Sequence, residues 1–324
     1  MSRRHFLTCL PPVLLSAALA MPMVGAAEPA VQRMDARIPV WVPASGDSPA
    51  HSAELAGHVY RPHGQGPWGL IVLNHGTPSG KEARETMRDR YGPQARETMR
   101  DRYGPQARAL AELGYVVVTG LRRGYGASDG PLADRYGSCD DPDYAHAAQE
   151  AARDVAAIMT YGQKLPYVDG SHVLLLGKSA GGFASLALAA QQPAGLRGVV
   201  NFAGGRGSQP QMREKAAVCG EAQLLKTVAG FAATSRVPQL WIYAENDSYF
   251  RPPLVRKMAE SYLAAGQNLK LVFAPSSGAE GHQFFDRAAN IGQWLPQVRE
   301  FLMQQLPGTA AAQLQRPNSL GDKP

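Results

Sequence analysis

The sequence predicts an α/β fold in which a mostly parallel, eight-stranded β-sheet carries helices on both faces. Short runs of branched apolar residues alternate with longer stretches rich in alanine and leucine. This alternation is typical of strands joined by crossover helices, which produce a parallel sheet. The run 173–176 is apolar at every position, as expected of a strand that is buried on both faces of such a sheet.

The elements follow one another in a regular order. The eight strands are expected at 31–41, 54–61, 69–74, 115–119, 173–176, 196–203, 237–244 and 269–274. The first two alternate between apolar and polar residues, which predicts two antiparallel strands at the start of the sheet. Helices are expected at 107–113, 143–162, 183–190, 254–265 and 285–306. Together they predict one domain over residues 28–306.

Two segments depart from this pattern. Residues 204–236 have irregular periodicity, which predicts a small cap segment above the sheet that helps to form a substrate pocket. Residues 83–94, ARETMRDRYGPQ, are repeated without change at 95–106. The Gly-Pro pair in each copy prevents one continuous helix. We expect one copy to be extruded as an extra helical turn and loop on the surface; the alternative is a basic lid near the pocket.

The two ends of the chain are also distinctive. Residues 1–27 combine Arg3-Arg4, an apolar run broken by prolines, and the small residues Gly25-Ala26-Ala27. This pattern resembles a twin-arginine export signal, with a general secretory signal as the alternative. It predicts a periplasmic or secreted protein with no membrane span once the signal is removed. The tail 307–324 lacks a core pattern and is expected to be disordered.

Composition and cysteine content narrow the class of protein. The formal charge is +6, and the basic residues are scattered, so no nucleic-acid partner is indicated. Cys139 and Cys219 would remain after export, where they can form a disulfide or stay as two buried thiols. The sequence contains no His-Glu-x-x-His, no paired Cys-x-x-Cys and no Gly-x-Gly-x-x-Gly after a strand. We therefore expect no metal and no cofactor.

The most informative stretch is Gly177-Lys178-Ser179-Ala180-Gly181-Gly182, between the apolar strand and a helix. Glycines are needed at the first and fifth positions if the strand and the helix pass too closely for a Cβ. A serine on this sharp turn is held in a strained conformation, and its hydroxyl is presented at the edge of the sheet. The pattern predicts that Ser179 is a catalytic nucleophile.

A serine hydroxyl needs a neighbouring base to attack at neutral pH. His282 follows the last strand and is flanked by a glycine, which favours it as the general base. Asp247 follows the preceding strand and is the best candidate for the carboxylate that orients the imidazole. Glu245 is its local rival and Asp286 a more distant one. Asp247 would otherwise cap a helix or form an Asx turn.

A tetrahedral intermediate also needs hydrogen-bond donors for its oxyanion. The backbone N–H of Ala180 begins a helix, and that of Thr77 lies in the first loop after a strand, so both are expected to donate. His75 is expected to brace that loop rather than to act as a second base. Lys178 is expected to point aside into solvent; the alternative is that it biases the pocket towards anionic substrates.

These motifs resemble the α/β-hydrolase superfamily over residues 31–306. The resemblance rests on His75-Gly76, on Arg123-Gly124-Tyr125-Gly126-Ala127-Ser128, on the serine motif above, and on Asp247 and His282, in that order. The short cap and compact size are similar to the dienelactone hydrolase-like and prolyl oligopeptidase-like branches, although dienelactone hydrolases proper have cysteine where Ser179 stands. The resemblance implies an α/β-hydrolase fold with a Ser179–Asp247–His282 triad.

The leading hypothesis is a serine hydrolase that cleaves small-molecule carboxylic esters through an acyl-enzyme. A peptidase or amidase of the prolyl oligopeptidase-like type would use the same residues. A third hypothesis is a non-catalytic binding protein that keeps the fold. The sequence indicates neither the preferred acyl or alcohol group nor the oligomeric state.

Overall fold

The computed structural model describes residues 30–44, 46, 48–78 and 103–305 of the 324-residue chain. The expected export signal at 1–27 and the tail at 307–324 lie outside the described residues. So do the first copy of the repeat and most of the second, and with them the expected extruded loop.

The expected eight-stranded sheet is confirmed, with the strand order β1-β2-β4-β3-β5-β6-β7-β8. β2 is antiparallel to both of its neighbours, β1 and β4. The remaining strands pair in parallel, in the order β4-β3-β5-β6-β7-β8. The strands are β1 Val31–Val42, β2 His51–Pro62, β3 Trp68–Asn74, β4 Tyr115–Gly120, β5 Val168–Lys178, β6 Leu196–Phe202, β7 Gln239–Ala244 and β8 Leu269–Ala274. The parallel strands therefore end along one edge, where loops from several of them meet.

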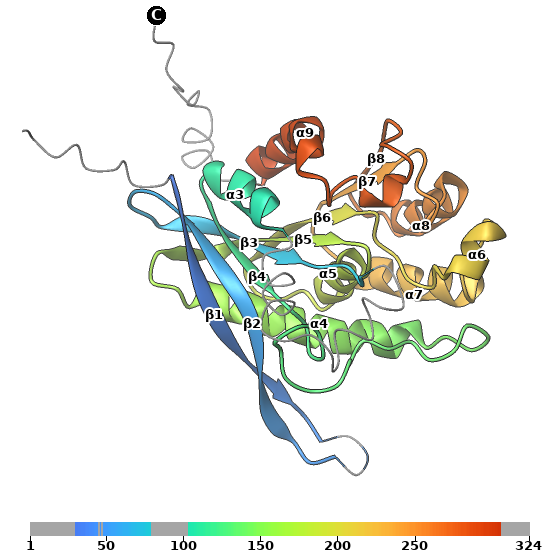
Figure 1. Cartoon of the computed structure of the whole chain (residues 1–324), viewed down its shortest axis with the longest axis horizontal. Helices are drawn as coiled ribbons and strands as arrows, with labels where there is room; N and C mark the ends of the chain where they lie inside the picture. The colour runs from blue at the N-terminus through green and yellow to red at the C-terminus, as the bar shows by residue number, and fades with distance from the viewer. Residues whose placement is uncertain (1–29, 45, 47, 79–102, 306–324) are drawn as a thin grey trace, which may run out of the picture.

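Helices cover both faces of the sheet (Figure 1). α3 (Gly104–Glu112) and α9 (Ile291–Gln304) pack on one face, and their apolar residues share a core with alternate residues of the strands. α4 (Tyr144–Gln163), α5 (Ala180–Ala190), α7 (Glu221–Thr234) and α8 (Pro252–Ala264) supply the second core. Because β3 and β5 contribute apolar side chains to both cores, their central residues are buried on both sides.

Two helices begin at residues other than those expected. α3 begins at Gly104 rather than at 107, because Pro105 has the backbone angle of a first helical turn and needs no hydrogen-bond acceptor there. α9 begins at Ile291 rather than at 285. The residues before it are held in turns, where the Asn290 side-chain amide donates to the Phe284 carbonyl (2.8 Å) and to Ser277 Oγ (2.9 Å).

The structure describes all of the segment 204–236, for which the sequence predicted a small cap. Its second half is the regular helix α7, whose residues Leu224, Val228 and Ala232 are buried in the core. α7 packs against α4, α5 and α8, the helices that supply the second core. The irregular part is therefore the shorter stretch 204–220, which contains only the five-residue helix α6 (Pro210–Glu214).

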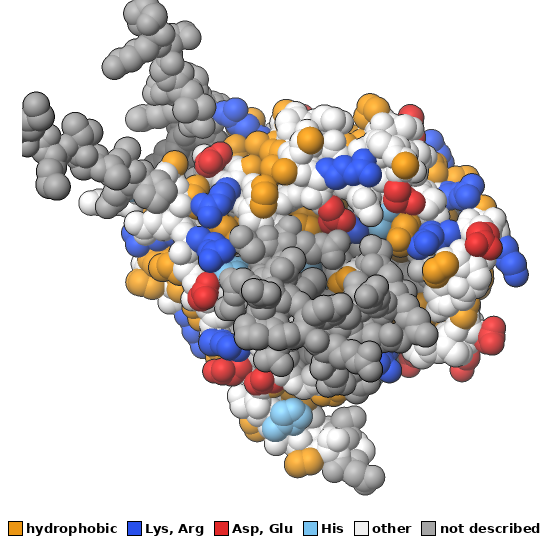
Figure 2. All heavy atoms as spheres, in the orientation of Figure 1, with side chains coloured by type: hydrophobic (Ala, Val, Ile, Leu, Met, Phe, Trp, Pro, Cys, Tyr) orange, Lys and Arg blue, Asp and Glu red, His pale blue; other side chains and the backbone are white. Residues whose placement is uncertain are grey.

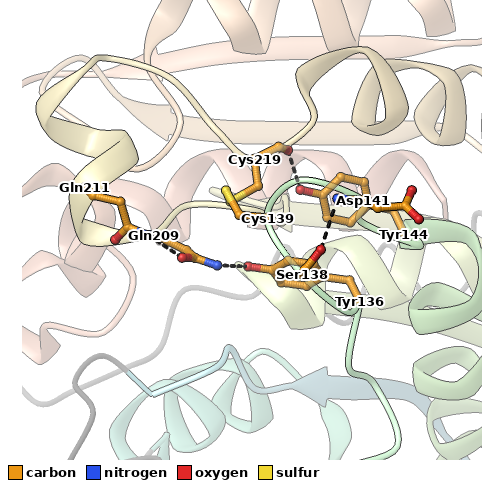
Figure 3. The surroundings of a disulfide bond; sticks show 8 residues. All are labelled: Tyr136, Ser138, Cys139, Asp141, Tyr144, Gln209, Gln211 and Cys219. Carbon is orange, nitrogen blue, oxygen red and sulfur yellow. Dashed lines mark hydrogen bonds between the residues drawn. A yellow bond between two sulfur atoms is a disulfide. The ribbon is translucent and has the colours of Figure 1, made fainter.

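A disulfide joins Cys139 to Cys219, which resolves the two alternatives left open by the sequence (Figure 3). It connects the loop before α4 to the end of the irregular stretch 204–220. The Tyr144 hydroxyl donates to the Cys219 carbonyl, and the Cys219 N–H donates to the Gly207 carbonyl at 2.9 Å. The covalent bond and these hydrogen bonds hold the stretch against the rest of the domain.

One face of the molecule shows the distribution of charged side chains among the described residues. On the face drawn in Figure 2, lysine and arginine side chains are interspersed with aspartate and glutamate. Within the described part of the chain, no helix combines the length and the apolar character needed to cross a membrane.

We expect the Cys139→Ala/Cys219→Ala variant to lose about 2–4 kcal/mol in free energy of unfolding, because the disulfide restricts a long loop of the unfolded chain. Urea unfolding followed by circular dichroism measures this loss. A reducing agent should lower the stability of the wild type by a similar amount and leave the variant unchanged. Equal midpoints for wild type and variant would contradict the prediction.

Candidate active site

Ser179 lies between the end of β5 and the first residue of α5, as the sequence predicted. Its backbone has φ 56° and ψ −122°, a conformation that residues with a Cβ rarely adopt. The Ser179 N–H donates to the Phe202 carbonyl at 2.9 Å, and the Ser179 carbonyl accepts from the Phe183 N–H at 3.0 Å. These bonds to β6 and α5 hold the strained turn in place.

The two glycines around Ser179 are required by close approach of the backbone. A Cβ on Gly177 would lie 2.3 Å from the Gly181 carbonyl oxygen, and a Cβ on Gly181 would lie 2.3 Å from the Asn74 carbonyl oxygen. Both distances are far below van der Waals contact. Any other residue at either position would therefore push α5 away from the sheet and move the serine.

The structure brings the three expected side chains into one hydrogen-bonded series. Ser179 Oγ lies 3.0 Å from His282 Nε2, and His282 Nδ1 lies 3.0 Å from Asp247 Oδ2. The exposed fractions of the three residues are 8%, 4% and 1%, so the series is largely shielded from solvent. The serine comes from the β5–α5 turn, and the other two side chains come from the loops after β7 and β8.

The two oxygens of Asp247 have different partners. Oδ1 accepts the backbone N–H groups of Tyr249 (2.8 Å) and Phe250 (3.0 Å), which is the turn that such a residue forms on its own. Oδ2 remains available for the imidazole. The rival Glu245 is exposed, and Asp286 pairs with Lys178, so neither takes the place of Asp247 beside His282.

Lys178 does not point into solvent as expected. Lys178 is only 3% exposed, and its ammonium group lies 3.2 Å from Asp286 Oδ2. Lys178 is the last residue of β5. Its side chain is buried against the loop that carries His282 and Asp286. The carboxylate of Asp286 makes this burial tolerable.

Burial has a direct effect on His282. Desolvation lowers the pKa of the imidazole below its ordinary value, and the positive charge of Lys178 lowers it further. The carboxylates of Asp247 and Asp286 act in the opposite direction but do not outweigh burial. The lowered pKa favours the neutral imidazole, which is the form that can accept a proton.

Hydrogen bonds between His75 and Arg122 hold the loop after β3 in place. The Arg122 N–H donates to His75 Nε2 at 3.0 Å, so the ring proton is on Nδ1, which donates to the Gly76 carbonyl at 2.9 Å. The Arg122 guanidinium donates to the His75 carbonyl at 2.7 Å. His75 thus has the structural role that the sequence predicted.

Asp134 lies at the centre of this buried network. It accepts hydrogen bonds from the Arg122 guanidinium (3.1 and 3.2 Å) and the Tyr125 hydroxyl (3.0 and 3.2 Å), and it pairs with Arg206 at 3.5 Å. Burial alone would raise the pKa of Asp134, but the guanidiniums of Arg206 and Arg122 hold it at about 2. The carboxylate therefore stays charged and links the loops around the serine.

The two expected oxyanion donors lie beside the serine. Ala180 is the first residue of α5, where a backbone N–H has no acceptor within its own helix. Thr77 follows Gly76, at which an added Cβ would lie 3.0 Å from Ser179 Cβ. The Thr77 hydroxyl also accepts from the Arg206 guanidinium at 3.4 Å, which ties this loop to the stretch 204–220.

The loop of His282 is held by three further groups. Glu280 Oε1 accepts the N–H groups of His282 (2.8 Å) and Ser248 (3.2 Å), so one carboxylate binds both the base loop and the acid loop. On the other side, the Gln106 amide of α3 donates to the Phe285 and Asp286 carbonyls at 2.8 and 3.0 Å. Tyr103, just before α3, packs against the Phe285 ring.

Comparison with known protein families shows to which family the chain belongs. Residues 51–284 match the family described as X-Pro dipeptidyl-peptidase (S15 family), and this match spans more than half of the chain. The chain belongs to the S15 peptidase family. No curated protein sequence matches it. The expected relationship to the α/β-hydrolase superfamily, in the dienelactone hydrolase-like and prolyl oligopeptidase-like branch, is thereby confirmed.

Solved structures share the fold of this S15-family chain at low sequence identity. A Klebsiella pneumoniae protein assigned as a dienelactone hydrolase is 15% identical with a TM-score of 0.52, covering 84% of this chain and 99% of its own. An esterase of Pyrococcus furiosus is also 15% identical, with a TM-score of 0.54 and coverages of 85% and 91%. Such similarity shows the α/β-hydrolase fold alone.

A third structure is a larger peptidase. The acylaminoacyl peptidase of Pyrococcus horikoshii is 16% identical with a TM-score of 0.56. The match covers 86% of this chain but only 42% of the peptidase. The S15-family chain therefore corresponds to less than half of that protein. The family match, together with the serine-centred site, identifies the chain as a hydrolase of the serine type.

Two carboxylates that support the site, Glu280 and Asp134, were not predicted from the sequence. Glu280 and Asp134 are acidic residues in loops, and a loop carboxylate is usually solvated. The only sequence signal for Glu280 is its place two residues before His282, where a carboxylate can cap the short 3₁₀ turn Gly281–Gln283. Asp134 carries no comparable signal, because its partners lie at distant positions in the sequence. Among the described residues, no cluster of histidine, cysteine and acidic side chains could hold a metal ion.

We expect Asp134→Asn to be destabilised at neutral pH, because two buried guanidiniums would lose their carboxylate. The folded-state pKa of about 2 lies below the ordinary 3.8, so the charged form stabilises the fold above about pH 4. This contribution of about 2 kcal/mol disappears as the pH falls towards 2.

Urea unfolding at about pH 5 and about pH 3 tests this, since the gap between wild type and Asp134→Asn should narrow at the lower pH. Asp140→Asn, at an exposed position near the disulfide, is the matched control and should show no such narrowing. A gap that stays constant between the two pH values would contradict the role given to Asp134.

Proposed function

We propose that this S15-family hydrolase cleaves small-molecule carboxylic esters through an acyl-enzyme. Ser179 is the nucleophile, His282 the general base and acid, and Asp247 the orienting carboxylate. The observation that carries the proposal is the hydrogen-bonded series from Ser179 Oγ to His282 to Asp247, with 3.0 Å at each step. This is the arrangement in which a base can take the hydroxyl proton as the oxygen attacks.

The first half-reaction forms the acyl-enzyme. Ser179 Oγ attacks the ester carbonyl carbon while His282 Nε2 takes the hydroxyl proton, giving a tetrahedral intermediate with a negative oxygen. The backbone N–H groups of Thr77 and Ala180 donate to that oxygen; such a donor contributes on the order of 3 kcal/mol. The bond to the alcohol oxygen then breaks, and His282 gives its proton to the departing alcohol.

The second half-reaction releases the acid. His282 takes a proton from water, and the oxygen of that water adds to the acyl carbon. The bond to Ser179 Oγ breaks as His282 returns the proton to the serine, so that the enzyme is restored and a carboxylic acid leaves. Throughout, Asp247 accepts the Nδ1–H of the imidazole, which fixes the tautomer and stabilises the imidazolium.

Peptide or amide hydrolysis is the second candidate function. The family match is to X-Pro dipeptidyl-peptidases, and one similar structure is an acylaminoacyl peptidase. Both candidates use the same three residues and differ in the leaving group. The short stretch 204–220, which contacts the Thr77 loop through Arg206, supports small substrates and favours the ester candidate.

We also propose export to the periplasm or beyond. The twin-arginine-like segment at 1–27 and the Cys139–Cys219 disulfide support this, because disulfides persist in oxidising compartments. Cell fractionation with and without residues 1–27 tests the proposal.

We expect Ser179→Ala to abolish labelling by a fluorophosphonate probe and to lower hydrolysis of p-nitrophenyl acetate by about a thousandfold or more. Ser185→Ala is a control for the loss of a buried hydroxyl outside the series. Rates with p-nitrophenyl esters of increasing acyl length and with aminoacyl-anilides then separate esterase from peptidase. A wild type that neither reacts with the probe nor turns over any of these substrates would instead support a non-catalytic binding protein.

The pH dependence provides a separate test. Because burial and Lys178 lower the pKa of His282, the acidic limb of kcat/KM should lie below the ordinary imidazole value of 6.5. Lys178→Met removes a positive charge, so its limb should move to higher pH. Identical limbs in wild type and Lys178→Met would show that this ammonium group does not act on His282.

A further inference from the structure

The imidazole of His282 is in contact with two aromatic side chains from the loop that carries Asp247. Tyr249 lies parallel to it, with ring centroids 4.0 Å apart and an interplanar angle of 7°. Phe250 meets it at a centroid distance of 5.5 Å and an interplanar angle of 65°. The hydrogen bonds to Asp247 and Ser179 fix two points of the imidazole, and the stacked ring fixes its plane.

A cation lies on the other face of the Tyr249 ring. The guanidinium carbon of Arg213, from α6, is 4.1 Å from the ring centroid. The imidazole centroid is 4.0 Å away, so the two groups cannot share one face and must lie on opposite sides. The Arg251 guanidinium donates to the Arg213 carbonyl at 3.4 Å, which ties α6 to the start of α8.

We propose that Tyr249 is a positioning residue for His282. Its ring holds the plane of the imidazole and stabilises the imidazolium that forms when Ser179 gives up its proton, and Arg213 moderates this effect from the opposite face. The inference rests on the proposed function, because it assigns a role to Tyr249 only if His282 is the base.

The physical basis is the charge distribution of an aromatic ring. The face of a ring carries partial negative charge and attracts a cation placed over it. When His282 is neutral, the contact is a stacking interaction; when it is protonated, the contact gains a cation–π component. The ring therefore favours the charged form, which is the form present in the transition state.

Arg213 works in the opposite direction. It is a permanent cation on the same ring, so it competes with the imidazolium for the ring's negative face and also repels it. The charged groups that act on the imidazole are Asp247, Lys178 and Asp286, and they are constant in this comparison. Glu280 is also constant; its carboxylate accepts the His282 backbone N–H rather than contacting the ring. Removal of the ring and removal of the cation should therefore shift the titration of His282 in opposite directions.

The test is the rate of fluorophosphonate labelling of Ser179 as a function of pH, which requires no knowledge of the natural substrate. In Tyr249→Leu, the acidic limb should move down by about half a pH unit, the size expected for a partly exposed cation–π contact, and the plateau rate should fall several-fold. Tyr249→Phe keeps the ring and should have the limb of the wild type.

Arg213→Met is the second variant, and its limb should move up by a few tenths of a unit. Arg256→Met is the matched control, because Arg256 lies over the ring of Phe273 on β8 in a similar way, at 4.7 Å, and should leave the limb unchanged. If Tyr249→Leu fails to fold, Tyr249→Met, which also removes the ring but keeps a long apolar side chain, takes its place and should move the limb down in the same way.

The outcomes separate this inference from the proposed function. Opposite shifts in Tyr249→Leu and Arg213→Met support it. A lower plateau with no shift of the limb would make Tyr249 a packing residue only and would overturn the inference while leaving Ser179 and His282 as proposed. A limb that moves upward in Tyr249→Leu, as greater solvation of the imidazole would cause, would also overturn it. A wild type that does not react at all would contradict the proposed function itself.

Discussion

The close approach of β5 and α5 is the constraint on which the site depends. Gly177 and Gly181 leave no room for a side chain between strand, helix and the neighbouring β3, and this contact forces Ser179 into a positive φ. The strain is balanced by the surrounding sheet, since the serine N–H bonds to β6 and its carbonyl to α5. The hydroxyl is therefore fixed by the most buried part of the fold rather than by a loop.

The other side chains reach the serine from loops, and each loop is fixed by polar contacts of its own. Glu280 joins the acid loop to the base loop, and Asp134 joins the loops after β3 and β4 to the stretch 204–220. Glu280 accepts backbone N–H groups, and Asp134 pairs with guanidiniums. Burying any of these groups without a partner would cost free energy of folding. The site thus combines a nucleophile set by packing with a base, an acid and donors set by buried charge.

The sequence predicted what depends on local pattern. Strand periodicity, the glycines around Ser179 and the chain order of Asp247 and His282 are each visible within a few residues. What could not be predicted depends on distant partners. The burial of Lys178 could not be predicted, because its partner Asp286 lies far away in the sequence, in the loop after the last strand. α7 was not foreseen because only three of its residues are fully buried, which leaves a weak helical pattern in the sequence. The stacking of Tyr249 on His282 requires knowledge of both loop conformations.

The contact between Tyr103, Gln106 and the loop of His282 bears on the repeat that precedes it. Residues 103–106 read Tyr-Gly-Pro-Gln, and the same four letters occur at 91–94. Excision of either 12-residue unit would join an identical Tyr-Gly-Pro-Gln to Ala107. The start of α3 would keep its side chains, and with them its hold on the catalytic loop. In-frame slippage of the gene at this point would thus change the length of the connection between β3 and α3. It would leave unchanged the residues that contact the loop of His282.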